Sequence, residues 1–178
     1  MRIKRFAIFL GILIVVILLL AWRLGAFKRV DLAEGKQPNL LMAGRWFHAP
    51  YREILDYVDI QFLPLVNSIP EITGICAVYF DNPQLVISDS LKAFAGLIVA
   101  DSAAAPPGLI LRQIFADDAL LASFNGSPII GQYKVYPAVE RWFQASRDST
   151  NGTILEVYHR DRKTRRVDYY FPVAHDEN

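Results

Sequence analysis

The chain has 178 residues, of which 53% are hydrophobic and 21% are charged, and its formal net charge is +1. This length allows one domain with a core and one appendage. A charge near zero gives no reason to expect a nucleic-acid partner, and the basic run from Arg160 to Arg166 is interrupted by Asp161, as in a solvated hairpin loop. The single cysteine, Cys76, can form no internal disulfide.

The amino-terminal segment carries a long uncharged stretch. Residues 6–22 would span roughly 25 Å as a helix, close to the thickness of a bilayer core. We therefore expect a membrane anchor over residues 1–27, with a transmembrane helix at about 6–24 and the lipid bilayer as a partner. A cleaved signal peptide is the alternative, because Met1 to Arg5 is basic. The stretch exceeds the usual signal-peptide core, and Trp22 and Arg23 stand where a small-residue cleavage motif belongs, so the uncleaved anchor is preferred.

Charges on the two sides of this stretch predict its orientation. Three cations precede it and three follow it closely, and the free amino terminus adds to the first group. We expect a single-pass membrane protein whose amino terminus is cytoplasmic and whose remaining domain is periplasmic or otherwise extracytoplasmic. A cytoplasmic domain is the alternative.

The rest of the chain predicts one order of elements twice after a polar linker at 28–38. Pro50 suits the first turn of an amphipathic helix, and the Ala- and Pro-rich stretch from Ser102 to Gly108 suits a connector between halves. In chain order we expect a strand at 39–47, a helix at 50–66, strands at 74–80, 93–100, 109–115 and 119–124, a helix at 130–145, and strands at 153–159 and 166–173.

This pattern predicts an α+β fold, in which a duplicated strand-helix-strand-strand unit forms antiparallel sheet and each helix covers one sheet face. Side chains alternate along the strand at 153–159. We expect Leu155 and Val157 to face the helices, and Glu156 and Tyr158 to lie on the uncovered face.

Four stretches together resemble the GyrI-like small-molecule-binding domains. The first is Ala77 to Val99, in which a strand ends in an aromatic pair and an Asp-Asn-Pro turn before a loop and another strand. Phe47 to Ile54 is similar to the entry to the family's first helix, Tyr136 to Gln144 to its second helix, and Ile154 to Asp161 to its late strand. The resemblance implies a GyrI-like/SHS2-type fold and an effector-binding domain at 39–175, with halves at about 39–101 and 108–173. It extends most closely to a single-pass member whose anchor directly precedes the domain.

The same resemblance implies a ligand site. It gives the role of the family's pocket glutamate to Glu156, and a small amphipathic or cationic molecule, or a peptide, would lie in a groove between the halves. Tyr158 shares the face of Glu156, and Tyr79, Trp46 and Tyr51 are the further aromatic candidates. An exposed strand carboxylate is the alternative interpretation of Glu156, and each aromatic side chain could serve only in core packing.

Two other functions remain open. Some proteins similar to this family hydrolyse strained electrophiles, which would make Glu156 a general base and Tyr79 or Tyr158 an acid. Alternatively, a membrane adaptor would recruit a protein partner through the basic hairpin at 162–166. We expect a binding module rather than an enzyme, and assign no catalytic residue, cofactor or metal. His48, His159 and His175 have no metal-ligand spacing.

Overall fold

The computed structural model describes residues 2–82, 91–150, 152–160 and 165–174. It has the α+β class and the antiparallel sheet that the sequence predicts. The helices are α1 (Arg2–Leu24), α2 (Tyr51–Tyr57), α3 (Leu63–Ser68) and α4 (Pro128–Ser146), with a π-helical turn at Val58–Phe62 and a 3-10 turn at Ser102–Ala104. The strands are β1 (Val30–Lys36), β2 (Leu40–His48), β3 (Ile72–Tyr79), β4 (Lys92–Val99), β5 (Ile110–Ile114), β6 (Asp118–Asn125), β7 (Ser149–Thr150), β8 (Ile154–Arg160) and β9 (Arg165–Ala174).

The strands form one antiparallel sheet in the order β1-β6-β9-β8-β3-β4-β2-β5, and β7 pairs with β9. Strands β2, β3 and β4 of the first half occupy one side of this order, and β6, β8 and β9 of the second half occupy the other. Strands β3 and β8 join the halves at the centre of the sheet. A residue in the middle of β8 therefore lies at the junction of the two halves.

Each half gives one strand to the other half. Strand β1 precedes β2 in the chain but pairs with β6, and β5 precedes β6 but pairs with β2. The connectors at 37–39 and 115–117 meet, because Gln37 donates from its backbone N–H to the carbonyl of Asp117 at 2.9 Å and from Nε2 to that of Phe115 at 2.7 Å. The region expected as a linker at 28–38 thus contains an edge strand of the sheet.

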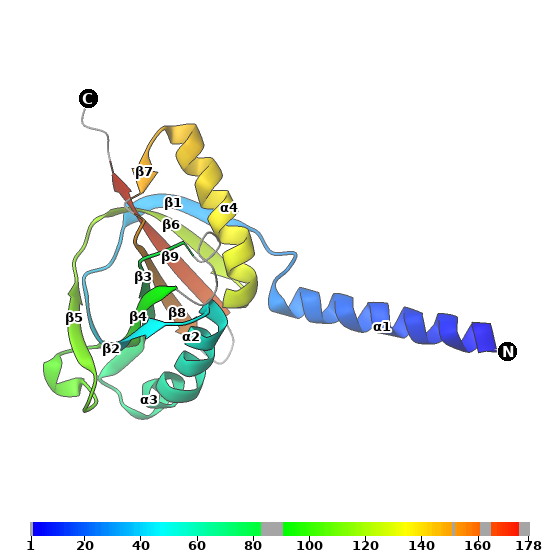
Figure 1. Ribbon diagram of the computed structural model, residues 1–178, viewed down its shortest axis with the longest axis horizontal. Helices are drawn as coiled ribbons and strands as arrows, with labels where there is room; N and C mark the ends of the chain where they lie inside the picture. Colours follow the sequence, from blue (N-terminus) through cyan, green and yellow to red (C-terminus); the bar gives the residue numbers. More distant parts are fainter. Residues whose placement is uncertain (1, 83–90, 151, 161–164, 175–178) are drawn as a thin grey trace.

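Helices α2 and α4 pack on one face of the sheet (Figure 1). On α4, Val135, Val139 and Phe143 recur at helical spacing and are buried, which forms the apolar stripe that a helix needs to cover a sheet. The helix-facing sheet residues are the alternate positions Ala77, Leu97 and Leu120, among others. The opposite sheet face carries a second apolar cluster that includes Met42, Cys76, Phe94, Leu155 and Val157.

This arrangement reverses one expectation for β8. Leu155 and Val157 belong to the cluster on the face away from the helices, whereas Ile154 and Tyr158 belong to the helix-facing core. The alternation of side chains along β8 was predicted correctly, but the set of side chains that faces the helices was predicted wrongly. Period-two spacing separates two sets of side chains without saying which set the helices cover.

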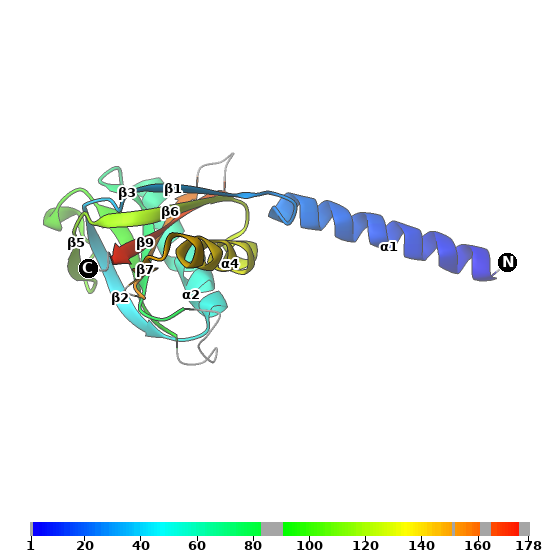
Figure 2. The same ribbon diagram turned by 90° about the horizontal axis from the view of Figure 1, so that it is seen from above.

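Helix α1 extends away from the sheet and the other helices (Figures 1 and 2). The apolar stretch does fold as one helix, but the helix begins at Arg2 and holds Arg23 in its last turn. Within the described part of the chain, no helix is long and apolar enough to cross a membrane. The predicted transmembrane span at about 6–24 and the single-pass membrane localisation, in either orientation, are therefore wrong, and the bilayer as a partner is not supported.

Hydrogen bonds join the carboxyl end of α1 to the turn between β6 and α4 and to α4 itself. The backbone N–H of Ser127 donates to the carbonyl of Leu24 at 3.0 Å, and the ammonium of Lys134 donates to the carbonyls of Ala26 and Lys28. Gly25 has a φ of +88°, and an added β-carbon would fall 2.9 Å from the α-carbon of Gly126, so this position needs a residue without a side chain.

Candidate functional site

The most unusual polar residue of the fold is Glu156, in the middle of β8. Its strand neighbours are Ala77 on β3 and Tyr169 on β9. Alternation along β8 points its side chain toward the helices, and the residue is 0% exposed. A carboxylate is rarely buried without a partner, because the loss of water destabilises the charged form. The hydrogen bonds around it therefore decide what the site can do.

Three tyrosine hydroxyls donate hydrogen bonds to this carboxylate. Tyr51 and Tyr158 each donate to Oε2 at 2.7 Å, and Tyr136 donates to Oε1 at 3.2 Å. The hydroxyls of Tyr79 and Tyr158 lie 3.2 Å apart, and the rings of Tyr51 and Tyr79 have centroids 5.2 Å apart. We call Glu156 and the tyrosines 51, 79, 136, 158 and 169 the tyrosine cluster.

Both halves of the fold contribute to the tyrosine cluster. Tyr51 is the first residue of α2, directly after Pro50, whose extended backbone (ψ 145°) ends the preceding segment and lets the helix begin. Tyr136 comes from the middle of α4, so α2 and α4 each contribute one tyrosine hydroxyl to the cluster on this face of the sheet. Tyr79 lies at the end of β3, while Tyr158 and Tyr169 lie on β8 and β9. The cluster therefore forms only when both halves are assembled.

Burial dominates the electrostatics of the cluster. It raises the pKa of Glu156 from its ordinary value of 4.5 to about 7, although the hydrogen bonds from Tyr158, Tyr51 and Tyr136 act in the opposite direction. Burial, followed by repulsion from the carboxylate, also raises the pKa of each of the five tyrosines. The hydroxyls are consequently neutral donors, and Glu156 is the group that changes charge near neutral pH.

One donor in the cluster differs from the others. Among the described residues, the hydroxyl of Tyr169 meets no partner at hydrogen-bond geometry, although its residue is 0% exposed. The hydroxyl of Tyr51 is close enough to influence the pKa of Tyr169, but it donates its own proton to Glu156. The Tyr169 hydroxyl lies against Gly131 of α4, where an added β-carbon would fall 2.2 Å from this oxygen. A buried hydroxyl without a hydrogen-bond partner lowers the stability of the fold. The Tyr169 hydroxyl could therefore donate a hydrogen bond to an acceptor that enters the cluster.

Four of the five residues selected from the sequence meet here: Glu156, Tyr158, Tyr79 and Tyr51. Trp46 does not meet them. Its side chain lies on the opposite sheet face, with its ring centroid 5.3 Å from those of both Phe80 and Phe94 and with the cations of Lys92 and Arg112 over the ring. Trp46 therefore cannot contribute to a site around Glu156.

Sequence reasoning did not select Tyr136 or Tyr169 as site residues. Tyr136 opens the stretch that resembles the second helix of the GyrI-like domains, so its position in that stretch was the available signal. Tyr169 pairs directly with Glu156 across β8 and β9, which requires the register of the two strands.

Other features named from the sequence have limited structural counterparts. In the part of the chain that the structure describes, no group of three or more His, Cys, Asp or Glu side chains could hold a metal ion. Residues 162–164 of the basic hairpin suggested for a protein partner at 162–166 lie outside the described residues, as does His175. His159 instead contacts the carboxylate of Asp168 at 2.9 Å, on the face away from the helices.

No protein-family model matches the sequence, and no curated protein matches it. Solved structures do match. The C-terminal domain of EcmrR superposes with a TM-score of 0.60 at 14% identity, over 82% of this chain and 98% of that domain. SAV2435 bound to tetraphenylphosphonium superposes with a TM-score of 0.56 at 10% identity, over 81% and 94% of the two chains. A hydrolase from Listeria innocua superposes with a TM-score of 0.53 at 8% identity, over 83% of this chain and 92% of that chain.

The chain has a GyrI-like fold. At these identities the likeness concerns the fold alone, so function has to be argued from the tyrosine cluster. The comparisons do not support the closer resemblance to a membrane-anchored member, testis-expressed protein 264.

Proposed function

We propose that this GyrI-like chain is an effector-binding module that holds a small amphipathic cation beside Glu156. One observation carries the proposal: the carboxylate is fully buried, and the hydrogen bonds that reach it come from tyrosine hydroxyls. Tyrosine donors lessen the cost of burial without neutralising the charge. A bound cation would neutralise it.

The surroundings of Glu156 suit a lipophilic cation. The tyrosine rings offer π-faces that attract cations and apolar area that replaces water around the ligand. In a medium from which water is excluded, the attraction between a carboxylate and a cation is much stronger than at the surface. SAV2435, which shares the fold, was solved with tetraphenylphosphonium, a cation without hydrogen-bond donors. That ligand class needs charge and aromatic contact, which are the two things the cluster provides.

The module comprises residues 39–175 in this proposal, with halves at about 39–101 and 108–173. The ligand lies between the halves, since α2 and β3 contribute Tyr51 and Tyr79, and α4, β8 and β9 contribute the other members. A peptide with a basic side chain is the alternative occupant of the same place.

Calorimetric titration of the protein with tetraphenylphosphonium tests this function. We expect saturable binding, and an affinity at least tenfold weaker in Glu156→Gln, which keeps the size of the side chain and removes its charge. Glu71→Gln, an exposed carboxylate just before β3, is the matched control and should bind as the unchanged protein does. Equal affinities in the Glu156→Gln variant and the control would overturn the role of Glu156.

A hydrolase is the second candidate, because Tyr158 and Glu156 form a 2.7 Å hydrogen bond in which a carboxylate and a phenol could act as base and acid. One structure that shares the fold is described as a hydrolase. A turnover assay with a cyclopropane-bearing substrate separates the two functions. Turnover that disappears in Glu156→Gln would favour the enzyme, whereas binding without turnover favours the module.

A further inference from the structure

A concave site lies at the far end of α4 from the tyrosine cluster. It is an open hollow of about 420 Å³, a volume within the range of small-molecule sites. We call it the α4 hollow. Its lining comes from the end of β1, the start of β6, the end of β9 and the last turns of α4, and comprises Glu34, Gly35, Lys36, Asp118, Ala119, Trp142, Asp148 and Val173.

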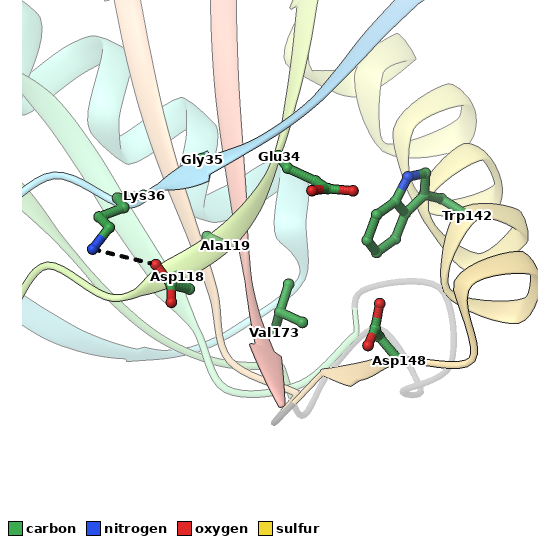
Figure 3. A pocket seen from close by; sticks show the side chains of 8 residues that line it. All are labelled: Glu34, Gly35, Lys36, Asp118, Ala119, Trp142, Asp148 and Val173. Carbon is green, nitrogen blue, oxygen red and sulfur yellow. Dashed lines mark ion pairs between the residues drawn. The ribbon is translucent and has the colours of Figure 1, made fainter. Parts of the chain in front are cut away.

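The α4 hollow combines an aromatic wall with negative charge. Figure 3 shows the carboxylate of Glu34 pointing toward the indole of Trp142, with the carboxylate of Asp148 near the end of α4. Ala119 and Val173 add apolar surface. Among the described residues that line the hollow, Glu34, Asp118 and Asp148 carry carboxylates and Lys36 carries an ammonium, which forms an ion pair with Asp118 at 3.5 Å.

The local fold adds to this negative potential. Helix α4 ends at Ser146, and Arg147 follows in the left-handed conformation, with φ 64°, which turns the chain so that Asp148 lines the hollow. The carboxyl end of a helix carries partial negative charge and attracts cations. Glu34 faces the same space because its neighbour across the strands is Leu120, a core residue on the helix side of the sheet.

The α4 hollow is separate from the tyrosine cluster. Trp142 lies six residues after Tyr136, which is about 9 Å along α4. Val173 lies four residues after Tyr169, which is about 13 Å along β9. A ligand of ordinary size in one site would not contact the carboxylate of the other.

We propose that the α4 hollow binds an organic ammonium ion that carries a small apolar group. The charged nitrogen lies between Glu34 and Asp148 and over the indole of Trp142, and the apolar group packs on Val173 and Ala119. An indole is the strongest of the natural side chains for attracting a cation to its face, and nearby carboxylates add Coulomb attraction. This inference stands independently of the function proposed for Glu156.

Benzyltrimethylammonium is a suitable probe, with benzyl alcohol as the uncharged comparison. In the full chain carrying Trp22→Phe and Trp46→Phe, the remaining fluorescence reports on Trp142. We expect saturable quenching by the ammonium compound, at least tenfold weaker binding in Glu34→Gln, and no saturation with benzyl alcohol. Glu53→Gln, an exposed residue on α2, is the matched control and should leave binding unchanged.

Glu156→Gln in the same background separates the two sites. Unchanged quenching in this variant, together with loss in Glu34→Gln, supports the α4 hollow as a site of its own. The proposal is overturned if quenching does not saturate, if Glu34→Gln binds within twofold of the control, or if Glu156→Gln weakens the binding as much as Glu34→Gln does.

Discussion

The hydroxyl of Tyr51 lies 2.7 Å from Oε2 of Glu156, although 105 residues separate them in the chain. This bond joins the first turn of α2, in the first half, to the central strand β8 of the second half. Because the acceptor is buried and charged in one of its two states, the bond couples the assembly of the halves to the protonation of Glu156. Stability and ligand binding should both depend on pH near 7.

The first prediction concerns stability. The pKa of Glu156 is about 7 in the folded protein and near 4.5 when the group is in water, so the folded state holds its proton more tightly. The contribution of this group is therefore most favourable below about pH 4.5, declines between about 4.5 and 7, and is constant above that range. For a shift of this size the decline is on the order of 3 kcal/mol.

Denaturant unfolding at pH 5 and pH 8 measures this effect in the unchanged protein and in Glu156→Gln. Other groups titrate in both proteins, so the informative quantity is the difference between their changes in unfolding free energy. We expect the unchanged protein to lose more stability between the two pH values. Parallel pH profiles of the two proteins would show that Glu156 keeps an ordinary pKa in the fold.

The second prediction concerns the binding of cations, and it depends on the function proposed above. Only the ionised form of Glu156 attracts a cation, and this form is depleted as the pH falls below the pKa of about 7. The affinity for tetraphenylphosphonium should fall up to tenfold per pH unit below 7 and level off above it. Titration calorimetry at pH 6 and pH 8 should show this change, whereas Glu156→Gln should bind weakly and equally at both. A constant affinity in the unchanged protein would contradict the prediction.

Periodicity and motif order were sufficient to predict most of the fold. The predicted helix at 130–145 and the observed α4 differ by two residues at the start and one at the end, because Pro128 begins the helix. Strand β1 was missed because its charged residues, Asp31, Glu34 and Lys36, face solvent or the α4 hollow at the edge of the sheet. An edge strand has no continuous apolar pattern, so local sequence does not distinguish it from a linker.

The site was harder to predict than the fold, for reasons that Glu156 and Trp46 illustrate. Glu156 was selected, but its face was assigned wrongly, since alternation alone does not fix which side the helices cover. Trp46 was selected as an aromatic candidate from the first half, yet its position on strand β2 places its side chain on the opposite face. Tyr169 meets Glu156 only through the pairing of β8 with β9, which is a long-range property of the sheet.

The third prediction concerns the hydroxyl of Tyr169, which has no hydrogen-bond partner in the part of the chain that the structure describes. In the absence of ligand, this buried donor lowers stability, because it gives up water without gaining an acceptor. Tyr169→Phe should therefore leave the free energy of unfolding unchanged or raise it by about 1 kcal/mol. Tyr158→Phe is the matched comparison, since the Tyr158 hydroxyl donates to Glu156, and its removal should cost about 1 to 3 kcal/mol. Equal losses in the two variants would mean that the Tyr169 hydroxyl has a partner in solution.

The fourth prediction concerns Gly131, the residue of α4 that faces Tyr169. At an exposed helix position, replacing glycine with alanine stabilises the helix by about 1 kcal/mol. Gly11 of α1 has no atom within 4 Å of an added β-carbon, so Gly11→Ala should show this gain. At Gly131 the β-carbon would fall 2.2 Å from the Tyr169 hydroxyl oxygen and 3.2 Å from Phe124. Tyr169 is buried and cannot move aside, so Gly131→Ala should destabilise the fold by about 1 to 3 kcal/mol.

A double-mutant cycle identifies the hydroxyl as the cause of this cost. In the Tyr169→Phe background the closest remaining contacts of the new β-carbon are 3.2 Å, to Phe124, and 3.3 Å, to the ring carbon that carried the hydroxyl. Such contacts are tight but can be relieved by small shifts. Gly131→Ala should therefore cost at least about 1 kcal/mol less in this background than in the unchanged protein. Chemical denaturation of the four proteins gives the coupling energy, and additive effects would show that α4 does not hold Gly131 against the Tyr169 hydroxyl.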